Sequence, residues 1–593
     1  MNDIEFNQNK TILPFLKRMY RYTLLHEKKR LVLLVIFAGI VGTIDSFYPF
    51  IFSGFINECL SGNMGNTKLP YLDIFLSPCM FRYFLYLLGA CVGISVSVAI
   101  FVYAAGSIGE RVIYQLRREI FEKLQRLPFA YYDQNSSGWL LSRISSDTDR
   151  VAEVISWGLI GIAWAIVSIF FCFGIMLYMN WKMTLIVLIS IPLMIVISAK
   201  IRAKILSYSR ISRKINSEMI GLITEHINGV ELNKVLANES KAVSIFSEKA
   251  EQHRKASCKS AFYSATYFPI VIVVGNMAAA GVLIYGANLV LEKSTLISLG
   301  ILSSFFIYAI QIFEPIADIS NYYSIAQNCL SAGERIFSLL DEPLALEDEL
   351  HKANFESIQG NIELKNIQFG YNESKMILQD FNLKIPSGQQ VAIVGPTGEG
   401  KSTIASIIAR FYLPSAGHIL IDGIDVNDRT MESYRQQVGV VLQQPHVFSG
   451  TIADNVRFGK SNMTDVEISQ IFTEMGCIEM ASRMNEEIKP DGINLSVGEK
   501  QLIAIARVFA YNPKILILDE ATSAIDTITE QRLQMAIQRV LKNRTSLVIA
   551  HRLSTIVESD RILYIQSGKI IEDGNHASLM KMKGEYWKLN QVS

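Results

Sequence analysis

The sequence predicts an α-helical membrane domain followed by an α/β domain, and three observations support this division. Six long and almost uncharged runs of residues precede Ser331. The charged half that follows contains a glycine-rich loop between a strand-like and a helix-like segment. The chain carries 56 Lys and Arg against 55 Asp and Glu, a balance that argues against a global electrostatic partner such as nucleic acid.

The first 30 residues form a segment of their own. Basic side chains are interleaved with apolar ones between Thr11 and Lys29, a pattern typical of an amphipathic helix that lies on a lipid surface. We therefore expect a cytoplasmic elbow over residues 1–30, a transmembrane domain over 31–330, a polar and acidic linker over 331–357, and an α/β domain over 358–593.

Each of the six apolar runs is long enough to cross a membrane. A helix rises 1.5 Å per residue, so about 17 or more residues suffice for a hydrocarbon core of about 30 Å. The runs are 31–57, 83–109, 154–181, 183–199, 260–291 and 294–313. The seven cysteines show no CxxC spacing and no even framework, so we expect buried small residues in a reducing or membrane setting.

The basic residues predict the orientation of these spans. Seven Lys and Arg precede Leu31, seven lie in 110–153 and twelve in 200–259, whereas the alternate loops together hold four. By the positive-inside rule, the richer segments and both termini are cytoplasmic in a multi-pass protein of the cell membrane. The two long basic loops are rich in helix formers, so we expect the spanning helices to continue into the cytoplasm and turn there.

The glycine-rich loop fits the pattern GxxxxGK[ST] of a phosphate-binding loop. A predicted strand (391–394) precedes it and a predicted helix (404–410) follows it, which is the context that the motif requires. Lys401 would reach the β- and γ-phosphates, and the Ser402 hydroxyl would bind Mg²⁺. The expected phosphate-binding residues are Gly395, Pro396, Thr397, Gly398, Glu399, Gly400, Lys401, Ser402 and Thr403.

Another predicted strand (515–519) ends in two neighbouring carboxylates, Asp519 and Glu520. A buried strand seldom ends in two acids unless a cation lies nearby, so this pair predicts a metal site. Further along, residues 495–501 resemble the LSGGQ signature, and Gln443 stands in a stretch that resembles a Q-loop. With the six spans, these motifs resemble the ABC transporters, in the exporter arrangement of one membrane domain ahead of one ATPase domain.

This resemblance implies a role for each motif residue and the cofactors ATP and Mg²⁺. Tyr371 would stack on adenine, Gln443 and Asp519 would join Ser402 at the metal, and Glu520 would polarise the attacking water. Asp526 lies in the D-loop, and His551 would contact the γ-phosphate. Lys401, Gln443, Glu520 and His551 are thus the implied catalytic residues. Ser496 and Gly498 would bind an ATP held by a partner chain, so the resemblance implies dimerisation.

Val497 replaces a signature glycine that other exporters also vary, and two further features of the ATPase half depart from the family pattern. Glu499 stands where the signature usually has Gln, and it adds negative charge near a triphosphate. The stretch before Leu495 is shorter than usual, and Pro490 occupies the place of an acid. Contacts of this stretch with the membrane domain therefore do not follow from the resemblance.

The interpretation is an ATP-driven half-transporter that exports a small or amphipathic substrate such as a drug, lipid or peptide. A homodimer in lipid is favoured because the catalytic motif residues are present, although Glu499 keeps a heterodimer open. A non-transporting or gating membrane ATPase and an importer of the same fold are the alternatives. Asp45 is the candidate substrate residue, because a carboxylate inside the first span is costly. Pro49 has no N–H, so it would leave the backbone carbonyl of Asp45 without a helical partner and kink the helix. The competing role for Asp45 is packing.

Overall fold

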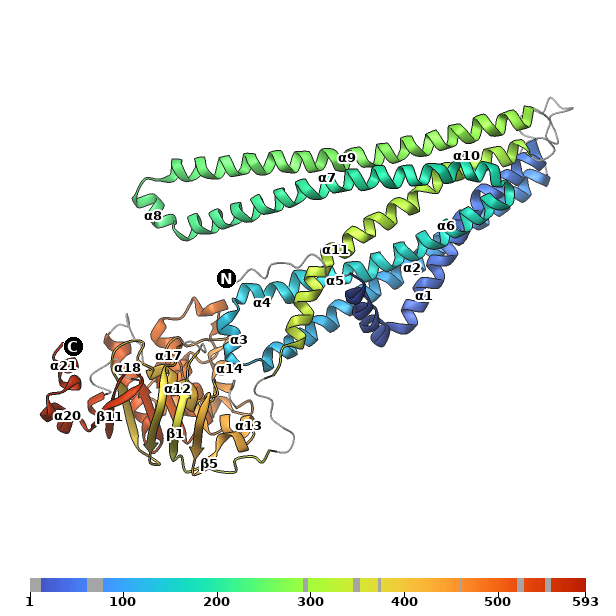
Figure 1. Cartoon of the computed structure of the whole chain (residues 1–593). Helices are drawn as coiled ribbons and strands as arrows, with labels where there is room; N and C mark the ends of the chain where they lie inside the picture. The colour runs from blue at the N-terminus through green and yellow to red at the C-terminus, as the bar shows by residue number, and fades with distance from the viewer. Residues whose placement is uncertain are drawn as a thin grey trace. The chain divides into compact units, whose positions relative to one another are not determined.

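Figure 1 shows a computed structural model of the chain. It describes residues 12–60, 78–291, 297–344, 352–371, 375–458, 460–519, 527–549 and 556–592. They form two compact units, which combine 1–122 with 140–341 and 123–139 with 342–593. Parts of the predicted elbow (1–11), sixth span (294–296) and linker (345–351) lie outside the described residues, and the domain boundaries remain predictions.

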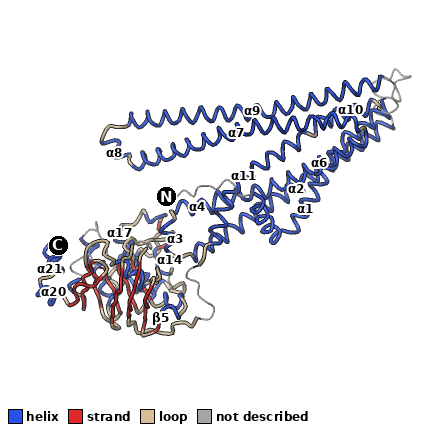
Figure 2. Tube along the Cα trace, viewed as in Figure 1, coloured by secondary structure: helices blue, strands red, loops and turns tan. Residues whose placement is uncertain are grey.

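The first unit consists of helices, as the tube in Figure 2 shows. Its elements are α1 (Ile12–Phe55), the π-helix Ile56–Leu60, α2 (Pro78–Arg126), α4 (Ser137–Ser142), α5 (Thr148–Glu153), α6 (Leu159–Met179), α7 (Trp181–Asn228), α8 (Val230–Val235), α9 (Glu239–Leu291), α10 (Leu299–Gln311) and α11 (Phe313–Asp341), with π-helical turns at Arg143–Asp147 and Val154–Gly158. Among the described residues, six helices are long and apolar enough to cross a membrane. The predicted class of the membrane half is therefore confirmed.

Helix α1 contains the described part of the predicted elbow and most of the first span, with a break at Glu27. The backbone of Glu27 leaves helical geometry (φ −132°, ψ 32°). Its buried carboxylate accepts hydrogen bonds from Arg30 at 3.3 Å and from Arg111 of α2 at 3.1 Å. Ahead of the break, Arg18 donates two bonds of 2.8 Å to Asp341 at the end of α11. Charged contacts thus tie the amphipathic segment to α2 and α11.

A buried charge cluster holds the intracellular part of the helical unit together. Asp147 is 1% exposed, and its carboxylate accepts from Arg143 at 2.7 Å and from Arg335 of α11 at 3.0 and 2.6 Å. Burying a carboxylate is costly unless it is paired, and here two guanidinium groups share it. The stretch around Asp147 is therefore fixed to α11.

The cysteine prediction is wrong in part. Cys59 and Cys79 form a disulfide with a Cα–Cα distance of 5.8 Å, which joins the end of the π-helix after α1 to the start of α2. Among the free cysteines, Cys91 and Cys258 are exposed, whereas Cys172, Cys329 and Cys477 are buried. The spacing of 20 residues between the paired cysteines gives no local signal, because the pairing depends on two helix ends that meet in space.

The second unit contains a six-stranded sheet in the order β12-β11-β3-β10-β9-β6 and a four-stranded antiparallel sheet in the order β2-β1-β4-β5. The first comprises β12 (Lys569–Gly574), β11 (Arg561–Gln566), β3 (Gln390–Val394), β10 (Thr545–Ile549), β9 (Ile515–Asp519) and β6 (Val438–Val441); the second comprises β2 (Leu378–Ile385), β1 (Ile362–Phe369), β4 (Ala416–Ile421) and β5 (Ile424–Asp425); β7 (Gly450–Thr451) pairs with β8 (Glu487–Ile488). All neighbours in the six-stranded sheet are parallel except β12 and β11.

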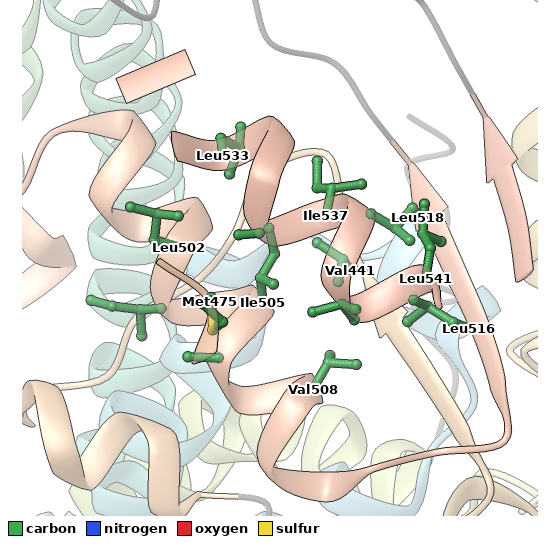
Figure 3. Packing of buried hydrophobic residues seen from close by; sticks show 14 of the residues in the cluster. Val441, Met475, Leu502, Ile505, Val508, Leu516, Leu518, Leu533, Ile537 and Leu541 are labelled. Carbon is green, nitrogen blue, oxygen red and sulfur yellow. The ribbon is translucent and has the colours of Figure 1, made fainter. Parts of the chain in front are cut away.

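Helices cover this sheet and form a helical subdomain beside it. They are α3 (Phe129–Gln134), α12 (Lys401–Ile408), α13 (Met431–Arg435), α14 (Ile452–Arg457), α15 (Asp465–Glu474), α16 (Ile478–Ser482), α17 (Val497–Tyr511), α18 (Thr527–Leu541), α20 (His576–Met582) and α21 (Glu585–Val592). Figure 3 shows part of the core, where Leu516 and Leu518 of β9 lie among side chains of α17 and α18 such as Ile505 and Ile537. This packing fixes β9 and α17, which carry two of the predicted motifs.

Candidate nucleotide-binding site

The phosphate loop follows β3 at the carboxyl edge of the parallel sheet. Gly395, Gly398 and Gly400 have φ values of 144°, 87° and 98°, which side chains rarely tolerate. A Cβ on Gly395 would lie 2.2 Å from the carbonyl oxygen of Ile565. Gly400 is the N-cap of α12, so the loop ends at a helix N-terminus. Backbone N–H groups in such a loop form an anion-binding cradle.

Lys401 points back over this loop. Its side chain is buried, and its Nζ donates to the carbonyls of Gly395 at 2.8 Å and Pro396 at 2.6 Å. Burial lowers the pKa of Lys401, and the carboxylates of Asp519 and Glu399 oppose part of this shift. The Lys401 ammonium group thus lies where phosphate oxygens can replace these two carbonyls as its hydrogen-bond acceptors.

The structure brings together two of the three predicted metal ligands. Ser402 Oγ, in the first turn of α12, donates to Asp519 Oδ2 at 3.3 Å. Register places the ends of β3 and β9 on either side of β10, since Ile549 pairs with both Ile393 and Asp519. Gln443 is exposed two residues beyond β6, which neighbours β9. A hydroxyl, a carboxylate and an amide at one edge form an all-oxygen donor set that fits Mg²⁺.

Three predicted site residues, Glu520, Asp526 and His551, lie outside the described residues. Glu520 directly follows Asp519, the last residue of β9. His551 comes two positions after β10, which ends at Ile549. The roles proposed for Glu520 and His551 rest on the sequence and on the sheet edge at which β9 and β10 end. The role proposed for Asp526 rests on the sequence.

Tyr371 lies in an aromatic group beside the phosphate loop. Its ring is 46% exposed, and its hydroxyl is 3.3 Å from Thr403 Oγ1. Phe369 and Tyr412 each meet the ring edge-on with centroids 5.1 Å away. One face of Tyr371 can therefore remain available to a flat base, while its neighbours set the orientation of the ring.

The same aromatic group contacts α3. The Tyr412 hydroxyl hydrogen-bonds Asp133, and the rings of Phe411 and Phe129 lie 4.5 Å apart. Burial and the bond to Asp133 raise the pKa of Tyr412. Residues of α3 line a cavity of about 670 Å³ together with Tyr371 and Tyr412. The bond between Tyr412 and Asp133 was not predicted, because Tyr412 belongs to no motif and the pairing spans 279 positions.

The predicted signature segment opens helix α17. Ser496 is the N-cap: its Oγ accepts from the N–H of Glu499 at 3.2 Å, and its own N–H donates to the Glu499 carboxylate at 2.8 Å. The Ser496 hydroxyl proton can still donate to a phosphate. Among the described residues, no hydrogen bond or ion pair joins Ser496 or Gly498 to the phosphate loop, so one chain presents the two motifs separately.

Asp45, the candidate substrate residue, is half-buried in α1. The chain continues as a helix through Pro49, and within α1 only Glu27 leaves helical dihedrals. The Asp45 carbonyl is also not an open acceptor, because Gln311 Nε2 donates to it at 3.3 Å. The predicted exposure of this backbone group was therefore wrong, since a side chain of α10 replaces the proline's missing donor. Glu314 is exposed at the start of α11.

Comparison with known proteins identifies the chain. The family described as "ABC transporter transmembrane region" matches residues 31–316, and that described as "ABC transporter" matches residues 378–523. The ABC transporter ATP-binding protein YfiC of Bacillus subtilis is 32% identical over 96% of this chain and 93% of its own length. The chain belongs to the ABC transporters. The second unit contains the ATPase domain of this multi-pass membrane transporter, which binds ATP.

Further relatives agree with an exporter. An ATP-dependent lipid A-core flippase of Desulfotalea psychrophila is 33% identical over 81% of this chain and 84% of its own length. The solved structure of a bacterial Atm1-family ABC exporter with ATP bound has a TM-score of 0.79 and 24% identity, over 96% of this chain and 99% of that one. The predicted fold, a six-helix membrane domain followed by an ATP-binding cassette, is therefore confirmed.

Proposed function

We propose that the chain is a half-transporter that works as a homodimer and exports a small or amphipathic substrate, such as a drug, lipid or peptide. The observation that carries the proposal is the phosphate cradle, with Lys401 above it and Ser402 against Asp519 at its edge. This geometry follows six spans in the same chain. An ATP site fused to a helical membrane domain is suited to converting hydrolysis into a change of access.

In this proposal each group of the ATP site has one task. Lys401 exchanges the carbonyls of Gly395 and Pro396 for β- and γ-phosphate oxygens. Ser402, Asp519 and Gln443 hold Mg²⁺, which supplies positive charge against the phosphate oxygens. Glu520 orients and polarises the attacking water, and His551 contacts the γ-phosphate. Positioning and electrostatics therefore supply most of the catalysis.

The proposal places the second half of each ATP site on another copy. Ser496 and Gly498 open α17 with an N-terminus suited to phosphate, yet they make no hydrogen bond or ion pair with the described phosphate loop of their own chain. A two-fold pair would let each signature face the partner's Lys401, Asp526 and bound ATP. Two such sites form only when the ATPase domains close together.

Charge and redox chemistry support the proposed orientation in the cell membrane. The basic loops favour cytoplasmic termini, which places the ATPase where ATP is available. The Cys59–Cys79 disulfide joins helix ends in the loop with few basic residues. A disulfide persists on an oxidising side of the membrane, which agrees with an external position for this loop.

The substrate class rests on the names of relatives and on the apolar helices. The relatives include the lipid A-core flippase and a fatty acid ABC transporter of Mycobacterium tuberculosis that is 31% identical over 82% of this chain. Both names denote amphipathic lipids. A substrate with an apolar body and a polar end would also suit helices that carry few charges, such as α6.

The test is to purify the chain alone in lipid nanodiscs and to measure particle mass and ATPase activity together. We expect a dimer with Mg²⁺-dependent hydrolysis that candidate lipids or drugs stimulate, and ATP-dependent accumulation of such a substrate in inverted vesicles. A monomeric or inert lone chain would contradict the homodimer. Hydrolysis without movement of any tested amphiphile would favour the gating alternative.

A further inference from the structure

Glu499, the acidic residue at a signature position, forms an ion pair with Arg483. Arg483 Nη1 donates to Glu499 Oε1, and Arg483 Nε donates to Glu486 at 2.7 Å. The second carboxylate oxygen of Glu499 accepts from the Ser496 N–H at 2.8 Å. Both oxygens of this carboxylate thus have a donor within the nucleotide-binding unit.

The pair is shielded enough for its charge to matter. Side-chain exposure is 32% for Arg483 and 21% for Glu499, so water screens it less than a surface pair. Burial raises the pKa of Glu499, but the Ser496 N–H and the Arg483 guanidinium outweigh this effect and lower it overall. The carboxylate is therefore negatively charged at neutral pH.

That charge lies where it would repel an anion. Ser496, Glu499 and Arg483 line a cavity of about 340 Å³ at the N-terminus of α17. Helix N-termini favour anions, but a bare carboxylate in the first turn already occupies this favourable field. A phosphate at the same turn would meet like charge unless a cation compensated it. The neighbouring Lys500 Nζ bonds the carbonyl of Asp491.

We propose that Arg483 is a positioning residue that neutralises Glu499, so that the N-terminal turn of α17 can accept the triphosphate of an ATP held by the partner copy. The inference rests on the proposed function, because the phosphate comes from a second chain. Arg483 thereby supplies the positive charge that the signature needs when Glu stands in place of Gln. It also favours two identical chains, since each chain carries the compensation for its own departure from the pattern.

The competing role for Arg483 is purely structural, because its pair with Glu499 joins the segment after α16 to α17, and its pair with Glu486 lies within that segment. The two roles predict different responses to removing Glu499 as well. If Arg483 only holds the subdomain, the double variant remains as defective as the single one. If Arg483 neutralises charge, the removal of Glu499 removes the need for it.

The test is a double-variant cycle on the full chain in nanodiscs, with ATPase rate measured against ATP concentration and Tm measured in parallel. We expect Arg483→Gln to raise the KM for ATP about tenfold, the order expected for one uncompensated charge near a partly buried phosphate. Adding Glu499→Gln should return the KM to within about twofold of wild type. Arg483→Lys should keep most of the affinity, because it keeps the charge.

Glu486→Gln is the matched control, since it removes the other partner of Arg483 and leaves Glu499 paired. Its KM should stay within about twofold of wild type. A normal KM in Arg483→Gln, or a double variant that stays impaired, would overturn the inference. An inert wild-type chain would overturn the proposed function and this inference with it, whereas an active wild type with an unrescued double variant overturns the inference alone.

Discussion

The nucleotide site and the interior of the membrane unit are assembled in different ways. The phosphate cradle comes from nine consecutive residues, Gly395 to Thr403, placed between β3 and α12. Around Pro49, by contrast, the contacts come from distant helices. Ser304 and Tyr308 of α10 donate bonds of 2.6 Å to the carbonyls of Pro49 and Ser46, over separations of 255 and 262 positions.

This difference explains why the ATPase can be recognised in a sequence and the substrate cannot. A phosphate always presents the same charge and geometry, so one loop conformation with the same glycines serves every chain. A cavity between helices has no such fixed target. Its polar groups sit on separate spans, and only their arrangement in space determines what binds.

The largest expected effect concerns the nucleotide site. Glu520→Gln should lower the ATPase rate by at least about a hundredfold and leave ATP binding intact, because the amide keeps the shape but cannot polarise water. Lys401→Ala should instead lose affinity for ATP itself. The ATPase rate and the equilibrium binding of labelled ATP distinguish these two variants. A Glu520→Gln chain that hydrolyses ATP at the wild-type rate would refute the assignment of this residue.

A second large effect concerns the stability of the helical unit. Asp147→Asn should destabilise it by about 3–5 kcal/mol, because the buried Arg143 and the partly buried Arg335 would lose their shared carboxylate. Asp149→Asn is the matched control. Its exposed pair with Arg117 should contribute at most about 1 kcal/mol. Thermal unfolding in nanodiscs measures both, and equal losses would contradict the role of the buried cluster.

Much of the fold and of the ATP site could be predicted from the sequence, because hydrophobic runs and contiguous motifs are local signals. The phosphate loop lies between a strand and a helix, as expected. The Cys59–Cys79 disulfide and the Tyr412–Asp133 bond were missed, since each depends on a meeting of distant segments. The carbonyl of Asp45 was misjudged for the same reason: its donor, Gln311, lies 266 positions away.

A moderate effect tests whether α3 responds to the nucleotide. Asp133→Ala removes the acceptor of the Tyr412 hydroxyl, whereas Asp133→Asn keeps an acceptor oxygen. We expect ATP to slow amide hydrogen exchange in Phe129–Gln134 of the wild type, and this protection to fall several-fold in Asp133→Ala. Asp133→Asn should lie between them. Equal protection in all three would show that the aromatic group does not transmit nucleotide binding to α3.

The smallest effect concerns the membrane interior. Asp45→Asn should leave Tm unchanged or slightly raised, because Gln311 bonds the backbone of Asp45 and an amide is less costly than a carboxylate in an apolar interior. Stimulation of the ATPase by cationic amphiphiles should fall about threefold if the carboxylate meets the substrate, and stimulation by neutral lipids should not. A lower Tm with unchanged stimulation would support the packing role instead.

The central claim, that each ATP site combines the phosphate loop of one copy with the signature of another, is tested by mixing two defective chains. Both carry Glu520→Gln to retain ATP; one also carries Lys401→Ala and the other Ser496→Arg. A mixed pair has one site with both defects and one intact site. We predict that each chain alone retains almost no labelled ATP after gel filtration, whereas the co-expressed mixture retains it. A mixture that retains no more ATP than its components would contradict the shared site.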